Sequence, residues 1–308
     1  MRIRATVVAV TGAVALSALA VPAAHAAGSS GAHGSIDTLK ALHAAASGRT
    51  AFTGSTAASG TPYALDAKFT GVSVNNGKPI VAGTSGKVRA AVTFKVTHGA
   101  GVDVTAGDTE LDVFIYRGSF TAPANILLGD DYPTCSNTSA TVATCKGTID
   151  ILPGEELGNA DATGWKATGY IVDWNDVDPF ADDIDYSKVG FTESASLTAA
   201  KLQRHSKLTV NAAPEPVKKG KTLTVTGKLS RANWDTGKYA GYSAQPVKLQ
   251  FRKKGSSAYT TVKTVRTSST GALKTTVKAT VDGYYRYVFA GTSTTPAATA
   301  TADFVDVK

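Results

Sequence analysis

Methionine occurs once, cysteine twice and histidine five times in this sequence of 308 residues. The four histidines after residue 26 have no sequence neighbours that suggest a nucleophile and its general base. The GxSxG, HExxH and P-loop patterns, which mark common catalytic and phosphate-binding sites, are absent. These absences predict that the protein is not an enzyme. An enzyme of unknown class, with a site assembled from residues distant in the sequence, is an alternative.

Long apolar runs are missing after the first residues, which argues against a membrane-spanning helix. The chain starts with the basic residues Arg2 and Arg4, followed by an apolar stretch over 5–21. Ala24-His25-Ala26 then provides the small residues of a cleavage site. We predict that residues 1–26 are a signal peptide and that the protein is secreted and extracellular, with no membrane insertion.

The two cysteines, Cys135 and Cys145, are separated by nine residues. Neither CxxC spacing nor a nearby histidine suggests redox or zinc chemistry. Because an exported chain reaches an oxidising compartment, we predict that the two thiols form a structural disulfide.

Helical periodicity is scarce, and apolar and polar residues alternate over most of the chain, as in half-buried strands. The exception is residues 27–61, which are rich in Ala, Gly, Ser and Thr. We predict a flexible tether there, with one short helix around Leu39 and Leu42. The rest predicts an all-β fold of two consecutive antiparallel β-sandwich domains, an acidic one at residues 62–203 and a basic, immunoglobulin-like one at residues 204–308.

Alternation along each strand also predicts which side chains point into a core. Trp165 differs in parity from Tyr170 and Trp174, so we expect it on the opposite face of their strand. Exposed rings there would suit stacking on sugars, whereas burial in a sandwich core is the commoner reason for such residues. The residues predicted to point inward in the second domain are Leu223, Val225, Val247, Leu249, Phe251, Leu273, Val277, Val281, Tyr285, Tyr287 and Phe289.

A resemblance to a known module lies in the segments VNAAPEPVKKGKTLTVTGKLSRANW, VKLQFRKKGSSAYTTVKTV and DGYYRYVFAGTSTTPAATATADFVDVK. They resemble the immunoglobulin-like module at the C-terminus of secreted Streptomyces proteins, over residues 205–308. The segments FIYRG, ATCKGTIDI and SKVGF are similar to the partner domain of such proteins, some of which carry a calcium-binding label. The resemblance implies a fold and export, and it transfers no site residue.

Charge is divided unevenly between the predicted domains. Residues 204–308 carry 13 Lys and 5 Arg against 5 acidic residues, a net charge of +13, whereas residues 50–203 carry 8 Lys and 2 Arg against 18 acidic residues, a net charge of −8. Outward lysines often serve only to keep sheet edges apart, but so strong a field also suits an anionic polymer outside the cell, such as teichoic acid. Nucleic acid is not predicted as a partner, since no aromatic residues are placed to stack bases. The predicted anion-binding residues are Lys248, Arg252, Lys253, Lys254, Lys274 and Lys278.

The acidic segment DWNDVDPFADDIDY, residues 173–186, is a second candidate site. Calcium takes about six to eight oxygen ligands, which clustered carboxylates can supply. The spacing is not that of an EF-hand, because Asp178 replaces the turn glycine and Ile184 replaces the final glutamate. A solvated loop, in which aspartates serve turn formation, is the other explanation. The calcium ligands that this alternative predicts are Asp173, Asn175, Asp176, Asp178, Asp182, Asp183 and Asp185.

These patterns predict a secreted, non-enzymatic binding or structural protein that associates with anionic cell-wall polymer through its basic domain. Extracellular calcium binding through the acidic segment is the main alternative, and calcium is the only cofactor suggested. The sequence indicates no oligomeric state.

Overall fold

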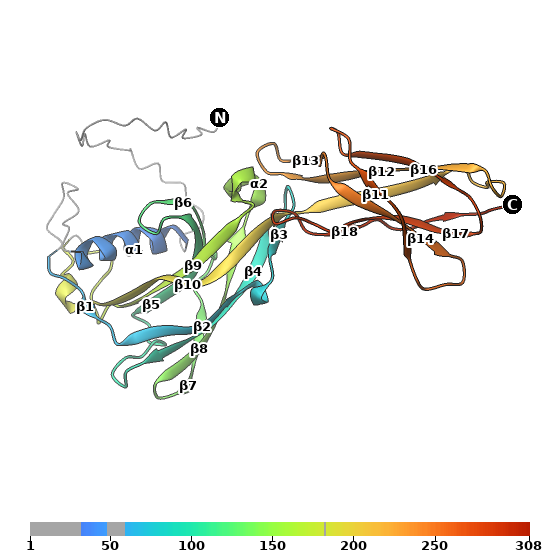
Figure 1. Cartoon of the computed structure of the whole chain (residues 1–308). Coiled ribbons are helices and arrows are strands. Elements are labelled where there is room, and N and C mark those ends of the chain that lie inside the picture. Colours follow the sequence, from blue (N-terminus) through green and yellow to red (C-terminus); the bar gives the residue numbers. More distant parts are fainter. Residues whose placement is uncertain (1–31, 48–58, 182) are drawn as a thin grey trace, which may run out of the picture.

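The computed structural model describes residues 32–47, 59–181 and 183–308. The predicted signal peptide lies outside the described residues. Strands form two β-sandwiches arranged end to end, and their pairing is mainly antiparallel (Figure 1). The predicted all-β fold is confirmed. None of the helices within the described ranges has the length and apolar character needed to cross a membrane.

Within the described residues, the first sandwich contains ten strands and a few short helical turns. One sheet contains β1 (Tyr63–Ala64), β3 (Ile80–Ala82), β5 (Thr109–Gly118), β6 (Pro123–Leu127), β9 (Gly164–Asp173) and β10 (Gly190–Arg204). The other contains β2 (Ala67–Val74), β4 (Val88–His98), β7 (Thr134–Ser139) and β8 (Val142–Ile151). The turns are η1 (Asn75–Gly77), α2 (Pro153–Glu156), η2 (Asn159–Asp161) and η3 (Tyr186–Lys188). The strand orders are β1-β10-β9-β5-β6, with β3 on β10, and β2-β4-β8-β7.

Alternating apolar residues hold these two sheets together. In β4, Ala90, Val92, Phe94 and Val96 are buried, because every second side chain of a strand points to the same side. Trp165 of β9, in the facing sheet, is buried in the same core. The period-two pattern of the sequence therefore determines the inner face of this sandwich.

Helix α1 (Ala32–Ala46) covers the outer face of the β10-β9-β5 sheet (Figure 1). Leu42 is fully buried there, in an apolar cluster with Phe114, Tyr170 and Trp174. As predicted, Tyr170 of β9 and Trp174, which directly follows β9, lie on the opposite side of the sheet from Trp165.

The short helix predicted around Leu39 and Leu42 is α1, but it is packed on the sheet and is not part of a free tether. Residues 27–31 and 48–58 of the predicted tether lie outside the described residues. A short amphipathic helix is only marginally stable alone, and it gains stability when its apolar face is covered. The outer face of the sheet provides that cover. Nothing in the local sequence of residues 32–46 shows that this face is apolar.

The second sandwich has two sheets with immunoglobulin-like connectivity. One contains β11 (Ser206–Ala213), β12 (Thr222–Asn233), β13 (Lys238–Gly241) and β16 (Ala272–Lys278). The other contains β14 (Pro246–Lys253), β15 (Thr260–Arg266), β17 (Gly283–Phe289), β18 (Ala298–Thr299) and β19 (Asp303–Val305). The chain crosses between sheets after β13, β15 and β16, which is the Greek-key pattern of this fold.

Most residues predicted to point inward form the core of this second sandwich. Phe251 and Val277 are partly buried at its edge. The prediction for Val281 was wrong, because β16 ends at Lys278 and the side chain of Val281 is 38% exposed in the turn beyond. Alternation holds only within a strand. The confirmed core residues are Leu223, Val225, Val247, Leu249, Leu273, Tyr285, Tyr287 and Phe289.

The junction between the sandwiches is packed. A single residue, His205, separates β10 from β11, and its N–H donates to the carbonyl oxygen of Ala82 at 2.8 Å. Ala232 and Trp234, from the second half of the chain, are buried in the core of the first sandwich. The indole Nε1 of Trp234 also donates to the carbonyl oxygen of Gly83 at 2.7 Å. These contacts fix one sandwich relative to the other.

Candidate functional site

The acidic segment of residues 173–186 begins at the end of β9, and its residues Asn175, Asp176, Asp178 and Asp183 are exposed, whereas Trp174 and Tyr186 are buried. The carboxylate of Asp173 accepts hydrogen bonds from the N–H of Asn175 and the hydroxyl of Tyr63. Asp178 likewise accepts from the N–H of Phe180 at 2.9 Å. These carboxylates therefore stabilise their own turns.

Asp185 closes the same segment. The hydroxyl and the N–H of Ser187 both donate to its carboxylate, and they hold the pKa of Asp185 below its usual range. Asp182 lies outside the described residues. Among those described, no group of three or more His, Cys, Asp or Glu side chains is close enough to hold a metal ion. The calcium alternative remains a prediction that these contacts do not support.

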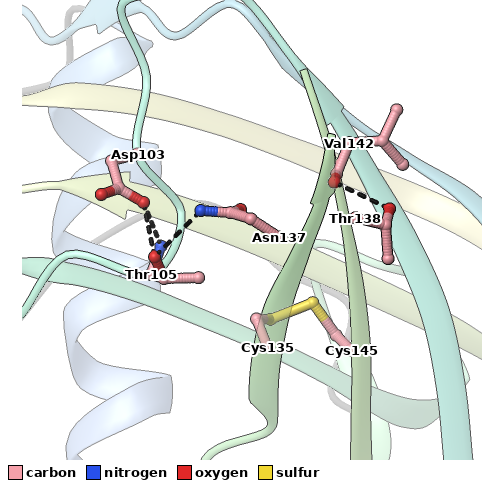
Figure 2. The surroundings of a disulfide bond; sticks show 7 residues. All are labelled: Asp103, Thr105, Cys135, Asn137, Thr138, Val142 and Cys145. Atoms are coloured by element: carbon pink, nitrogen blue, oxygen red, sulfur yellow. Dashed lines mark hydrogen bonds between the residues drawn. A yellow bond between two sulfur atoms is a disulfide. The ribbon is translucent and has the colours of Figure 1, made fainter. Parts of the chain in front are cut away.

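The predicted disulfide between Cys135 and Cys145 is confirmed (Figure 2). The two residues lie directly opposite each other on the paired strands β7 and β8. Beside them, the amide of Asn137 donates to the hydroxyl of Thr105, which in turn donates to Asp103. The edge strand β7 is thus held to both its neighbour and the loop before β5.

The predicted anion-binding residues do not form one surface. Lys248, Arg252 and Lys253 lie on β14, and Lys254 follows directly. Lys274 and Lys278 lie on β16 and are exposed, but β16 belongs to the other sheet. The structure therefore places the two groups on opposite sheets of the second sandwich.

Two members of the β14 group, Arg252 and Lys254, belong to a layer of alternating cations and rings. The guanidinium of Arg252 lies 4.1 Å from the ring centroid of Tyr284, and that of Arg286 lies 3.6 Å from the ring centroid of Tyr259. Arg252 also lies 5.3 Å from the Tyr259 ring, so that ring contacts both guanidiniums. We call this set the cation–aromatic layer: Arg252, Lys254, Tyr259, Tyr284, Arg286 and Phe304.

Hydrogen bonds hold both guanidiniums in place while leaving other donors free for a ligand. Arg252 Nη1 donates to the carbonyl oxygen of Ser256 at 2.7 Å, and Arg286 Nε donates to the Gln250 side chain at 2.9 Å. A hydrogen bond with Tyr259 raises the pKa of Arg252 above its already high ordinary value. Each guanidinium has five donors, and Arg252 also has hydrogen bonds with Tyr259 and Tyr284, so it retains fewer donors for an anion than Arg286 does.

The lysines are held differently. The Nζ of Lys254 lies 3.4 Å from the carboxylate of Asp282, which partly offsets its charge. Lys248 and Lys253 are exposed and carry their charge on flexible side chains.

Sequence reasoning missed Tyr259, Tyr284, Arg286 and Phe304. A signal for two of them exists in DGYYRYVF, where Tyr284 and Arg286 alternate with the buried Tyr285 and Tyr287. Alternation assigns them to the outer face but does not show which neighbours lie beside them. That depends on the pairing of β17 with β14 and β19.

No family model matches the chain, and no curated protein matches it. Among solved structures it is similar to the polymeric Ig receptor ectodomain of a teleost fish, at 13% identity and a TM-score of 0.22, covering 77% of this chain and 98% of that one. It is also similar to the mouse nectin-like molecule 4 ectodomain, at 11% identity and a TM-score of 0.21, covering 79% and 65% of the two chains. A third match is the Yersinia pseudotuberculosis adhesin InvE, at 13% identity and a TM-score of 0.23, covering 77% and 58%. Scores of this size carry no argument about function.

Proposed function

We propose that this is a secreted, non-enzymatic binding protein whose second sandwich attaches to an anionic polymer outside the cell. The observation that supports this most is the cation–aromatic layer, which holds two guanidiniums in fixed positions on an accessible sheet face. It lies in a region, residues 204–308, with a net charge of +13. The cation–aromatic layer forms an extended surface, which suits a ligand with repeating charge.

The fixed geometry of the layer favours binding in two ways. The Arg252 guanidinium, already held by Tyr284 and Ser256, loses less side-chain freedom when it contacts an anion than a free lysine does. Its planar donors also suit paired contacts with phosphate or carboxylate oxygens. The surrounding lysines add attraction over a distance set by the salt concentration.

Binding of the chain from residue 27 onward to immobilised teichoic acid, with a neutral polysaccharide as reference, tests this proposal. The full chain is required, because Trp234 lies in the core of the first sandwich. Replacing both arginines (Arg252→Gln with Arg286→Gln) should weaken binding about tenfold, since each exposed ion pair contributes up to about 1 kcal/mol. Raising salt from about 0.05 to about 0.5 M should release the polymer, because the Debye length falls well below 10 Å.

The matched control is Lys274→Gln with Lys278→Gln, which removes the same charge from the opposite sheet. It should weaken binding about twofold or less, because only the long-range field changes. Equal weakening by the two variants would show that net charge alone attracts the polymer. Absence of binding at low salt would overturn the proposal.

A further inference from the structure

A cleft with a volume of about 540 Å³ opens where the two sandwiches meet. Its walls come from residues 77–79 at the end of η1, residues 163–164 at the start of β9, residues 199–201 of β10 and residues 293–294 of the second sandwich. This volume lies within the range of small-molecule sites, which often form at domain interfaces.

Apolar residues, among them Val74, Pro79 and Ala200, line part of the cleft, and its polar lining consists of lysines and hydroxyl residues. Lys78 and Lys201 supply two ammonium groups, and Thr163, Ser293 and Thr294 supply hydroxyls. None of the described residues that line it carries a carboxylate, and within the same part of the chain neither lysine has an ion-pair partner. This is unexpected in a region, residues 50–203, whose net charge is −8. Unpaired ammonium groups beside hydroxyls suit an anion that itself carries hydroxyls.

The walls from the first sandwich are held by their own hydrogen bonds. The side-chain amide of Asn75 donates to the carbonyl oxygens of Lys78 and Pro79, at 3.1 and 2.9 Å. The N–H of Leu202 donates to the carbonyl oxygen of Thr163 at 3.0 Å. These hydrogen bonds therefore hold the backbone at Lys78 and next to Lys201 in place.

The wall from the second sandwich is fastened to the junction. The N–H of Arg204 donates to the carbonyl oxygen of Thr294 at 2.9 Å, and Gln203 Nε2 donates to that of Ser293 at 3.3 Å. Arg231 Nη1 lies 3.4 Å from the Thr294 hydroxyl, which places a third positive charge directly behind the wall. The cleft is therefore rigid as well as positive.

We infer that this cleft binds a hydroxylated anion, a sugar or polyol that carries a phosphate or a carboxylate. That this anion is a repeat unit of the anionic polymer rests on the proposed function. The site itself does not, because it shares no residue with the cation–aromatic layer.

Gly164 offers a way to block the cleft without changing its charge. It pairs in register with Lys201, so a side chain at this position would lie beside that lysine. A Cβ added at Gly164 meets no atom within 4 Å, and the residue does not have a positive φ. Gly164→Phe therefore places a ring at the cleft without strain on the backbone.

Titration of the chain from residue 27 onward, followed by backbone amide NMR, tests the inference. Glucose 6-phosphate and gluconate are the two charged probes, and they distinguish a phosphate ligand from a carboxylate ligand. At least one should shift the amides of Gly77, Gly164 and Ser293. Glucose and inorganic phosphate, which each lack one of the two features, should bind at least about tenfold more weakly.

Lys78→Gln with Lys201→Gln, and separately Gly164→Phe, should each weaken binding of that probe about tenfold. The control Lys95→Gln with Lys166→Gln removes two exposed charges from the same sandwich and should change nothing. If neither probe shifts these amides, or the control weakens binding as much as the cleft variants, the inference is overturned. The Arg252 and Arg286 replacements should leave binding of the probe unchanged. Failure of the polymer proposal can therefore be distinguished from failure of this inference.

Discussion

Asp112 shows how strongly one residue can depend on its surroundings. It lies on β5 beneath α1, is only 5% exposed, and among the described residues has no cation as a partner. Burial raises its pKa to about 7, and the nearby Glu110 adds to the rise, while a hydrogen bond from the N–H of Val113 opposes it. The folded chain therefore keeps a proton on this carboxyl that the unfolded chain releases near pH 4.

This difference in pKa predicts how stability depends on pH. Between about pH 4 and pH 7 the folded state binds more protons than the unfolded state, so the free energy of unfolding should fall as pH rises through this window. Asp112→Asn keeps the shape and cannot ionise. It should remove this dependence and raise stability above pH 7 by up to about 4 kcal/mol.

Urea unfolding of both proteins at pH 5 and pH 8 measures this effect. The difference between variant and wild type should be larger at pH 8 than at pH 5 by about 2–3 kcal/mol. A constant difference between the two pH values would contradict the raised pKa.

At the scale of elements, α1 and the sheet beneath it stabilise each other. β5 and β9 are buried on both faces, which requires a cover over Phe114 and Tyr170. The helix is also tied to β10, where His43 Nδ1 lies 2.6 Å from the carboxylate of Glu193. Its packing is therefore part of the first sandwich.

Leu42→Ala should lower the free energy of unfolding by about 2–4 kcal/mol, because it leaves a cavity beneath the helix. Hydrogen exchange of residues 39–46 should accelerate with it. Ala46→Ser, at an exposed position of the same helix, is the control and should change stability by less than about 0.5 kcal/mol. A Leu42→Ala effect as small as the control's would mean that this segment is a tether after all.

At the scale of the whole molecule, the packed junction holds the two sandwiches in one fixed arrangement. Trp234 is 3% exposed in the core of the first sandwich, although it lies in the turn between β12 and β13 of the second. The same junction fixes the cleft with Lys78 and Lys201 relative to the cation–aromatic layer. A polymer that contacts both surfaces would meet them in a constant arrangement.

Trp234→Ala should destabilise the chain by about 3–5 kcal/mol, through lost burial and the lost hydrogen bond to Gly83. It should also separate the unfolding of the two sandwiches, which calorimetry would record as two transitions. Trp234→Phe keeps most of the buried ring and should have a smaller effect. If the alanine variant unfolds with unchanged free energy, the junction does not couple the sandwiches.

The sequence by itself determined the strands and which of their residues face inward. Period-two alternation correctly placed Val225, Leu249 and Tyr287 in one core and set Trp165 apart from Tyr170. The spacing of the only two cysteines also identified their disulfide. Such features are local, because a strand's geometry or a short loop is enough to impose them.

Only the tertiary structure decided which outward residues become neighbours. Lys248 and Lys274 look equivalent in the sequence, yet sheet pairing places them on opposite sides of the sandwich. The same pairing brings Arg286 over Tyr259, and the contact between the sandwiches places Trp234, directly after β12, in the core of the first sandwich. The alternation of a strand does not show which residues its outward side chains contact. Contacts between distant strands depend on register and connectivity, which only the complete fold determines.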